Sequence, residues 1–226
     1  MRVPATDSTL QGPLILSYKM VMQESRHPHR RPNTGAAFSL IELLAILAVL
    51  LLLTTMYWNH GPSRRDRDIA SCQRNLEKIY LAAEIYAHDN SEKFPVAANA
   101  LTSEDALALL VPRDTSDTSV FICPATGTSK LPEGKSFRDW KISYAYYMGR
   151  HETDSGTALM SDAQINTFPK SAGTTVFSGD GKPPGNNHGK GGGNFLMCDG
   201  GVLSSTGTAP VSLLFSPPVV LLNPKP

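Results

Sequence analysis

The feature that most constrains the fold of this chain is the uninterrupted apolar run from Phe38 to Trp58, which contains a single carboxylate, Glu42. As a helix, this run would extend about 31 Å, enough to cross the hydrocarbon core of a bilayer. Its large aliphatic side chains each favour insertion by roughly 0.3–0.6 kcal/mol, whereas a carboxylate at mid-membrane costs about 3 kcal/mol and less near an interface. The run is therefore predicted to be a transmembrane helix, with Tyr57 and Trp58 at an interface.

The residues that flank the apolar run indicate that the membrane segment is retained. A secretory signal peptide has a small-x-small cleavage site after its apolar core, and the following TTMYWNHGPSRR offers no such site. The small residues TGAA instead precede the run, behind a leader that contains Lys19, Arg26, Arg30 and Arg31. Cleavage is therefore expected before the membrane segment.

The order of a small residue followed by FSLIEL resembles the class III signal of type IV prepilins and pseudopilins, in which F-T-L-I-E-L follows the scissile bond. Ala37 stands where that family usually has Gly. The resemblance implies that prepilin peptidase cuts between Ala37 and Phe38 on the cytoplasmic side and that Phe38 is N-methylated. It also implies that Glu42 pairs with the Phe38 amine of a neighbouring subunit, because two charges that lipid penalises separately neutralise each other in the correct register. The alternative is that Glu42 reaches the interface and has no partner.

Charge gives little information about orientation or partners. Arg64, Arg65 and Arg67 follow the span almost as densely as the basic leader precedes it, so the positive-inside rule does not fix the topology. The resemblance implies a single-pass protein of the inner (cytoplasmic) membrane, with the N-terminus inside and a periplasmic C-terminal domain. The formal net charge is +1 and no basic face dominates, so no nucleic-acid partner is expected.

After Gly61-Pro62, which would kink a helix, the sequence predicts an amphipathic helix that ends near Asn90. One apolar stripe recurs at steps of three and four residues and is expected to pack on a sheet; it consists of Ile69, Cys72, Leu76, Ile79, Ala83 and Tyr86. Thr102 and Asp105 predict the capping box of a short helix that ends before Pro112.

From Ser119 onward the pattern changes to short strand-like segments separated by turns. These are SVFICP, ISYAYYMG, TALMSD, TTVFSG, NFLMC and GVLSS. Helices followed by strands predict an α+β domain with an antiparallel sheet, and the prepilin resemblance makes the expected fold pilin-like, with a long N-terminal transmembrane helix packed on a small sheet.

The predicted organisation has five parts. These are a basic leader over 1–37, a transmembrane helix over 38–58, an amphipathic continuation of the helix over 59–90, a periplasmic α+β domain over 91–206 and a Pro-rich apolar tail over 207–226. The tail is too interrupted by Pro for a second span and is expected to cover the domain or contact a neighbour.

Soluble segments of the chain also resemble prepilin-like proteins that carry an H-x9-DG motif. The segments are CQRNLEKIYLAAEIYAHDNSEKFP, FICP, SYAYYMG and HGKGGGNFLMCDGG, in which ten rather than nine residues separate His188 from Asp199. Asp199-Gly200 itself indicates a hairpin turn. The motif residues His188, Asp199 and Gly200 are therefore interpreted as fold-specifying, with a subunit contact or a bound cation as the alternatives.

The preceding segment NFLMC alternates as a strand does. Phe195 and Met197 are predicted on one face, and Leu196 and Cys198 on the other.

The acidic residues and the cysteines offer two further candidate sites. By analogy with some pseudopilins, calcium would use the oxygens of Asp162, Asp180 and Asp199, which suit a hard cation. Cys72, Cys123 and Cys198 form no C-x-x-C pair, so neither a zinc finger nor a thioredoxin-like site is expected. In an oxidising compartment one disulfide can form, and all three pairings are open.

No enzyme signature is present: the glycine-rich GNNHGKGG departs from the P-loop pattern, and G-x-S-x-G and H-E-x-x-H do not occur. The sequence predicts a non-catalytic pseudopilin or type IV pilin-like subunit of a type II secretion system or related machine, with no required cofactor. Its expected partners are prepilin peptidase, other pilin or pseudopilin subunits, an assembly platform and the lipid bilayer. The alternative is a membrane-anchored periplasmic ligand-binding or metal-binding protein, or an enzyme, that uses the region of His188 and Asp199.

Overall fold

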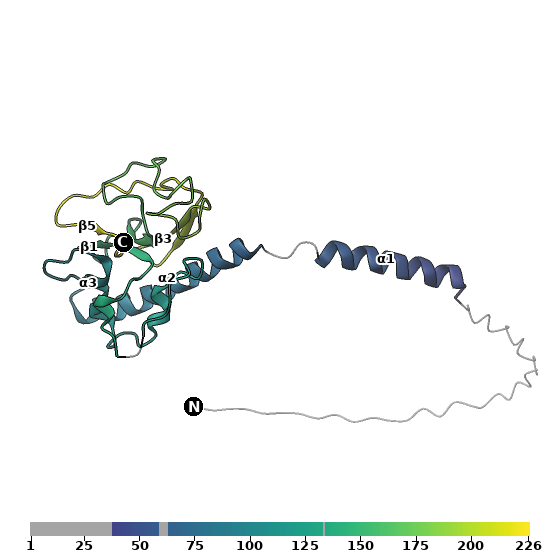
Figure 1. The fold of residues 1–226 in the computed structure, drawn as a ribbon, viewed down its shortest axis with the longest axis horizontal. Helices are drawn as coiled ribbons and strands as arrows, with labels where there is room; N and C mark the ends of the chain where they lie inside the picture. The colour runs from purple at the N-terminus through teal and green to yellow at the C-terminus, as the bar shows by residue number, and fades with distance from the viewer. Residues whose placement is uncertain (1–37, 59–62, 133) are drawn as a thin grey trace, which may run out of the picture. The chain divides into compact units, whose positions relative to one another are not determined.

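The computed structural model describes residues 38–58, 63–132 and 134–226 (Figure 1). The chain divides into two units, one that ends at Thr55 and one that begins at Met56. The predicted leader, with Ala37, and the predicted kink at Gly61-Pro62 lie outside the described residues.

The apolar run forms helix α1, from Leu40 to Trp58. A capping box begins the helix: the Glu42 backbone N–H donates to Ser39 Oγ at 3.3 Å, and the Ser39 backbone N–H donates to the Glu42 carboxylate at 3.1 Å. Every side chain described in α1 is exposed. The predicted helix of membrane-spanning length and composition is confirmed, and it is the one such helix in the described part of the chain.

Helix α2 runs from Arg64 to Asp89 and begins with a second capping box, between Ser63 and Asp66. Its buried face agrees with the predicted apolar stripe, although Ile69 and Tyr86 are half-buried. The buried residues of this face are Cys72, Leu76, Ile79, Ala82, Ala83 and Ala87. The predicted amphipathic helix is therefore confirmed.

A short helical segment follows α2, as predicted. It consists of α3, Ser103–Leu107, and the 3₁₀ turn η1, Ala108–Leu110. The Asp105 carboxylate accepts a hydrogen bond from the Thr102 backbone N–H at 3.0 Å, which is one half of the predicted capping box.

Five strands form one antiparallel sheet in the order β4-β3-β2-β1-β5. The strands are β1, Tyr144–Met148; β2, Ala158–Asp162; β3, Gly193–Met197; β4, Val202–Ser205; and β5, Val220–Leu222. The predicted α+β class with an antiparallel sheet is confirmed.

Two predicted strands are not strands. SVFICP begins as the 3₁₀ helix η2, Thr118–Phe121, because the Asp117 side chain accepts from the Ser119 backbone N–H and caps a helical turn. TTVFSG is a loop, since the backbone N–H groups of Val176 and Phe177 both donate to the Gly207 carbonyl and do not alternate along a partner strand.

The segment predicted as a tail contains β5, which lies at the edge of the sheet beside β1. Pro217 and Pro218 precede this strand and obscured it in the sequence, although an edge strand tolerates nearby Pro. Beyond it, Asn223 exchanges hydrogen bonds with the Gln164 backbone, and the Lys225 backbone N–H donates to the buried Glu104 carboxylate at 3.1 Å. The α+β unit therefore continues through the segment predicted as a tail.

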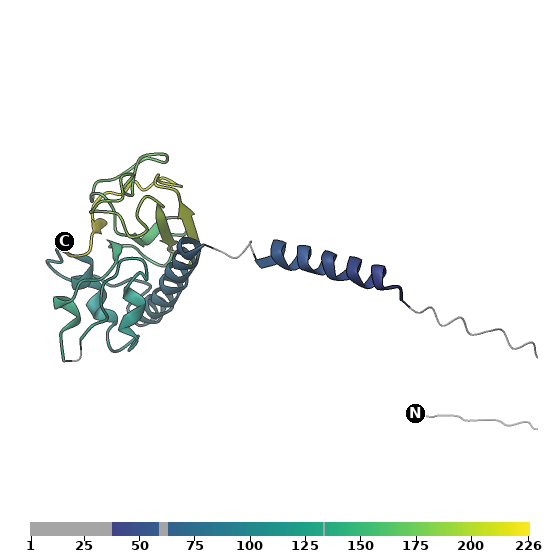
Figure 2. The ribbon, with the colours of Figure 1, turned by 45° about the vertical axis from the view of Figure 1, so that its right-hand side comes forward.

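The two faces of the sheet carry separate hydrophobic cores. One core lies between the sheet and α2, and the other lies under the loops that follow β2 and β4; Figure 2 shows α2 and these loops on opposite sides of the strands. Leu196 and Cys198 belong to the first core, and Phe195 and Met197 belong to the second. The predicted alternation along β3 is confirmed.

Candidate functional site

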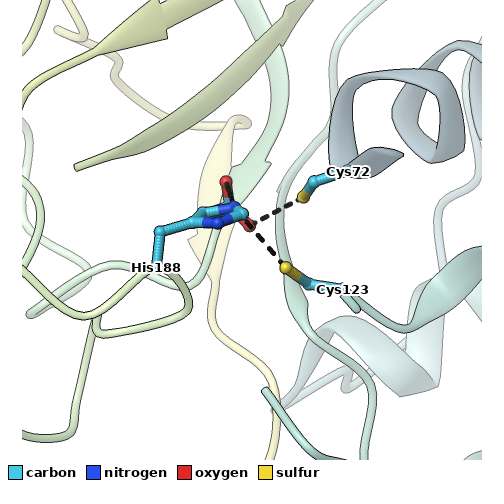
Figure 3. Close-up of side chains that lie close together, drawn as sticks. Cys72, Cys123 and His188 are labelled. Atoms are coloured by element: carbon cyan, nitrogen blue, oxygen red, sulfur yellow. Dashed lines mark hydrogen bonds and ion pairs between the residues drawn. The ribbon is translucent and has the colours of Figure 1, made fainter. Parts of the chain in front are cut away.

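Four side chains that are far apart in the sequence meet where β2 ends beside α2. They are Cys72, Cys123, Asp162 and His188, all of them buried, and their sulfur, oxygen and nitrogen atoms all lie within 4.8 Å of one another. Figure 3 shows both thiols and the imidazole pointing toward one another. Among the described residues, this is the one group of three or more Cys, His, Asp or Glu side chains close enough to share an ion. We call these four residues the buried cluster.

The two cysteines come from separate parts of the chain that a hydrogen bond holds together. Cys72 lies on the buried face of α2, and Cys123 follows η2. The Asn75 side chain on α2 donates to the Ile122 carbonyl at 2.9 Å, which fixes the chain next to Cys123 against the helix. This contact brings the two thiols to one point.

Asp162 is the last residue of β2, and its buried carboxylate accepts hydrogen bonds from two asparagines. Asn187 Nδ2 donates to Oδ1 at 2.7 Å, while Asn194 donates to Oδ2 through its backbone N–H at 2.7 Å and its side chain at 3.2 Å. Cys72 Sγ lies 3.2 Å from Oδ1. These donors compensate the desolvation of a carboxylate that is wholly buried.

His188 lies in the loop between β2 and β3, and its side chain is wholly buried. Its Nε2 atom is 3.3 Å from Asp162 Oδ2 and 3.4 Å from Cys123 Sγ, whereas Nδ1 has no hydrogen-bond partner in the described structure. Burial by itself would lower the pKa of His188, but the hydrogen bonds to Asp162 and Cys123 outweigh burial and raise the pKa to about 10. The imidazole therefore favours the cationic form.

The two thiols have different acidities. The neighbouring Cys72 thiol has the largest effect on Cys123 and, with a smaller contribution from His188, lowers the pKa of the Cys123 thiol to about 7. Burial raises the pKa of the Cys72 thiol well above its usual value. Cys123 is therefore the thiol that ionises more readily.

The geometry suits metal ligation better than nucleophilic catalysis. In a Cys-His-Asp relay the carboxylate orients the imidazole through the nitrogen opposite the nucleophile. Here Asp162 and Cys123 both face Nε2 of His188, and all four members are buried.

The carboxylates predicted to bind calcium do not meet in the described structure. Asp162 belongs to the buried cluster, whereas Asp180 and Asp199 are exposed on separate turns. Asp180 accepts a hydrogen bond from Ser178 Oγ at 2.7 Å, and Asp199 accepts one from Ser155 Oγ at 3.3 Å.

The predicted motif residues serve different parts of the fold. His188 belongs to the buried cluster, while Asp199 and Gly200 form the turn of the β3–β4 hairpin, as predicted. Gly200 has a φ of +83°, and a Cβ atom there would lie 2.8 Å from the ring of Tyr80 on α2. This glycine therefore allows both the turn and the close approach of the helix.

All three cysteines are free and buried in the structure. Cys72 and Cys123 lie together in the buried cluster, whereas Cys198 Sγ lies 3.5 Å from Thr157 Oγ1, outside the cluster. Of the three disulfide pairings that the sequence left open, the structure is compatible with Cys72 to Cys123.

The residues predicted for processing and assembly are described only in part, since Ala37 lies outside the described residues. Phe38 is exposed, and the Glu42 carboxylate accepts hydrogen bonds from the backbone and hydroxyl of Ser39.

The sequence matches no protein-family model, and comparison with curated proteins and with solved structures gives no match. The class of protein therefore follows from its geometry. In its described residues it is an α+β protein with one helix long and apolar enough to cross a membrane and a buried cluster of two cysteines, one aspartate and one histidine.

Proposed function

We propose that this protein is a pseudopilin or type IV pilin-like structural subunit that is anchored by α1 and assembles with other subunits through that helix. The observation that supports the proposal best is the position of Glu42. It is the one carboxylate of α1, and it lies in the first turn of an otherwise apolar helix whose described side chains are all exposed.

An exposed apolar helix is stable in lipid or against other helices. The hydrogen bonds between Glu42 and Ser39 satisfy two backbone N–H groups at the start of α1. Ser39 carries no positive charge, so these bonds do not neutralise the carboxylate. A charge within the hydrocarbon region costs about 3 kcal/mol when it is unpaired. A cationic amine on a neighbouring chain offsets this cost.

Cleavage before Phe38 provides such an amine. The FSLIEL segment, which resembles the prepilin signal, places the new amino terminus one turn before Glu42. The α+β unit supports the same proposal, because an amphipathic helix packed on an antiparallel sheet is the expected domain. In the assembled state this domain occupies the periplasm, and the subunit works mechanically in secretion or attachment.

The first experiment determines the mature N-terminus. The full chain is expressed with a prepilin peptidase, and the N-terminal peptide of the membrane fraction is analysed by mass spectrometry. We expect a chain that begins at N-methylated Phe38. A membrane form that keeps residues 1–37 would contradict the proposal.

The second experiment tests Glu42. Glu42→Ala is expected to leave membrane insertion intact and to abolish multimers detected by cross-linking between cysteines introduced into α1, because the neighbouring amine loses its counter-charge.

Ser39→Ala is the matched control. It weakens the start of the helix by about 1 kcal/mol but keeps the charge of Glu42, so multimers should persist. If the two variants lose multimers equally, Glu42 acts as a helix cap and not as an assembly residue.

A second candidate function, a membrane-anchored metal-binding or ligand-binding protein, is favoured by the buried cluster and by a cavity of about 540 Å³ beside it. Asn187 lines this cavity and also donates to Asp162. This function predicts a monomer with an uncut leader, which the experiments on Phe38 and Glu42 distinguish from a subunit.

A further inference from the structure

We propose that the buried cluster binds one zinc ion, with Cys72, Cys123, Asp162 and His188 as the four ligands. The ion would join α2, the segment after η2, the end of β2 and the loop between β2 and β3. The proposal is independent of membrane assembly, because all four ligands belong to the α+β unit.

The distances within the cluster agree with a tetrahedral zinc site. Zinc bonds of about 2.3 Å to sulfur and about 2.0–2.2 Å to nitrogen or oxygen give ligand-to-ligand edges of roughly 3.3–3.8 Å. Cys72 Sγ lies 3.2 Å from Asp162 Oδ1, and His188 Nε2 lies 3.3 Å from the other carboxylate oxygen, Oδ2, and 3.4 Å from Cys123 Sγ. With one ligand atom taken from each residue, no two of the four atoms are more than 4.8 Å apart. Small side-chain adjustments therefore suffice to bind the ion.

The donor types favour zinc over calcium or magnesium. Two sulfurs and one imidazole are soft or borderline ligands, whereas calcium and magnesium require mainly oxygen. A closed set of four protein ligands in a buried position is typical of a structural zinc site, which keeps no position open for a substrate.

Hydrogen-bond donors around the cluster would stabilise the net negative charge of a zinc site. Two thiolates and a carboxylate exceed the charge of the ion by one negative unit. Hydrogen-bond donors face these ligands: the Tyr144 hydroxyl lies 3.2 Å from Cys72 Sγ, and Asn187 and Asn194 donate to Asp162. Such partners orient ligands in metal sites and tune their basicity.

Two other states of the same atoms compete with zinc. The first is a disulfide between Cys72 and Cys123, and the second is a metal-free network of hydrogen bonds. A disulfide would remove both sulfur ligands and would not explain why the buried carboxylate of Asp162 and the imidazole of His188 converge on the thiols. Zinc uses all four groups.

The test measures zinc and thiols on the same sample. The full chain is purified in detergent, incubated with zinc chloride, dialysed and analysed for metal by mass spectrometry. Its thiols are counted with a chromogenic thiol reagent after denaturation in EDTA without reductant. We expect one zinc per chain and all three cysteines as thiols. Cobalt(II) in place of zinc should give the absorption bands of tetrahedral thiolate coordination.

Cysteine variants identify the ligands. Cys72→Ser and Cys123→Ser should each weaken zinc binding by about tenfold or more, because each removes a sulfur ligand. Cys198→Ser is the matched control and should keep one zinc, since Cys198 is also buried but lies outside the cluster.

The wild-type measurements decide the question even if a variant fails to fold. A wild-type chain that keeps no zinc overturns the proposal. A single remaining thiol then identifies the disulfide, and three thiols identify the metal-free network. Loss of zinc from Cys198→Ser together with retention by Cys72→Ser would also overturn it.

Discussion

At the scale of single residues, Gly200 connects the β3–β4 hairpin to α2. Its φ of +83° lies in the left-handed region, and the ring of Tyr80 occupies the space that a side chain would need. The Tyr80 hydroxyl also donates to the Cys198 carbonyl at 3.3 Å. One residue therefore determines both the turn and the distance between helix and hairpin.

We predict that Gly200→Ala lowers the free energy of unfolding by about 2–4 kcal/mol. Left-handed strain accounts for about 1 kcal/mol and the collision with Tyr80 for the remainder. Gly173→Ala is the matched control, because Gly173 has a φ of +81° with no atom within 4 Å of the added Cβ, and it should lose only the strain energy. Urea denaturation followed by circular dichroism measures the free energy of unfolding of both variants. An equal decrease in the two variants would show that Tyr80 moves aside.

Glu42 could be selected from the sequence as a candidate assembly residue because it is an isolated acid within an apolar run, and its role in assembly stays a prediction. The buried cluster could not be identified, because its ligands come from four elements that only the tertiary fold brings together. The lack of a C-x-x-C pair argued against a local zinc motif and had no bearing on ligands so distant from one another. Sequence spacing detects sites within one turn or hairpin, and this cluster is not of that kind.

At the scale of elements, periodicity predicted α2 and four of the five strands. The apolar stripe of α2 and the alternation along β3 were informative because each element buries one side against a different core. Periodicity failed for β5, which has only three residues and follows Pro218. Its position depends on pairing with β1 and on the contacts of Asn223, which the local sequence does not reveal.

We predict that truncation after Pro218 destabilises the α+β unit and promotes self-association. The truncation removes β5 and leaves the backbone of β1 as an unpaired edge, which is a template for intermolecular pairing. Truncation after Asn223 is the control, because it keeps β5 and the bonds of Asn223 to Gln164. Thermal denaturation and light scattering compare the two; similar melting temperatures and monomeric behaviour for both would contradict the prediction.

At the scale of the whole molecule, the two units differ in where their apolar side chains lie. Both hydrophobic cores are formed by residues that follow Met56, whereas the described side chains of α1 are all exposed. The α+β unit therefore has hydrophobic cores of its own.

We accordingly predict that a chain beginning at Ser63 folds in aqueous buffer without detergent and unfolds in one cooperative transition. Differential scanning calorimetry and size-exclusion chromatography with light scattering provide the measurement, with the full chain in detergent as the reference. Aggregation of the shortened chain, or a melting temperature far below that of the reference, would show that α1 contributes to the fold.

The sequence distance between the members of the buried cluster affects how the protein is made. Cys72 and Asp162 are 90 residues apart, and Cys123 and His188 are 65 residues apart, so the first thiol leaves the ribosome well before its carboxylate and imidazole neighbours. Throughout that interval it is accessible to oxidants and to the thiols of other nascent chains. The buried cluster can therefore close around this thiol only after the segment that contains His188 has been made.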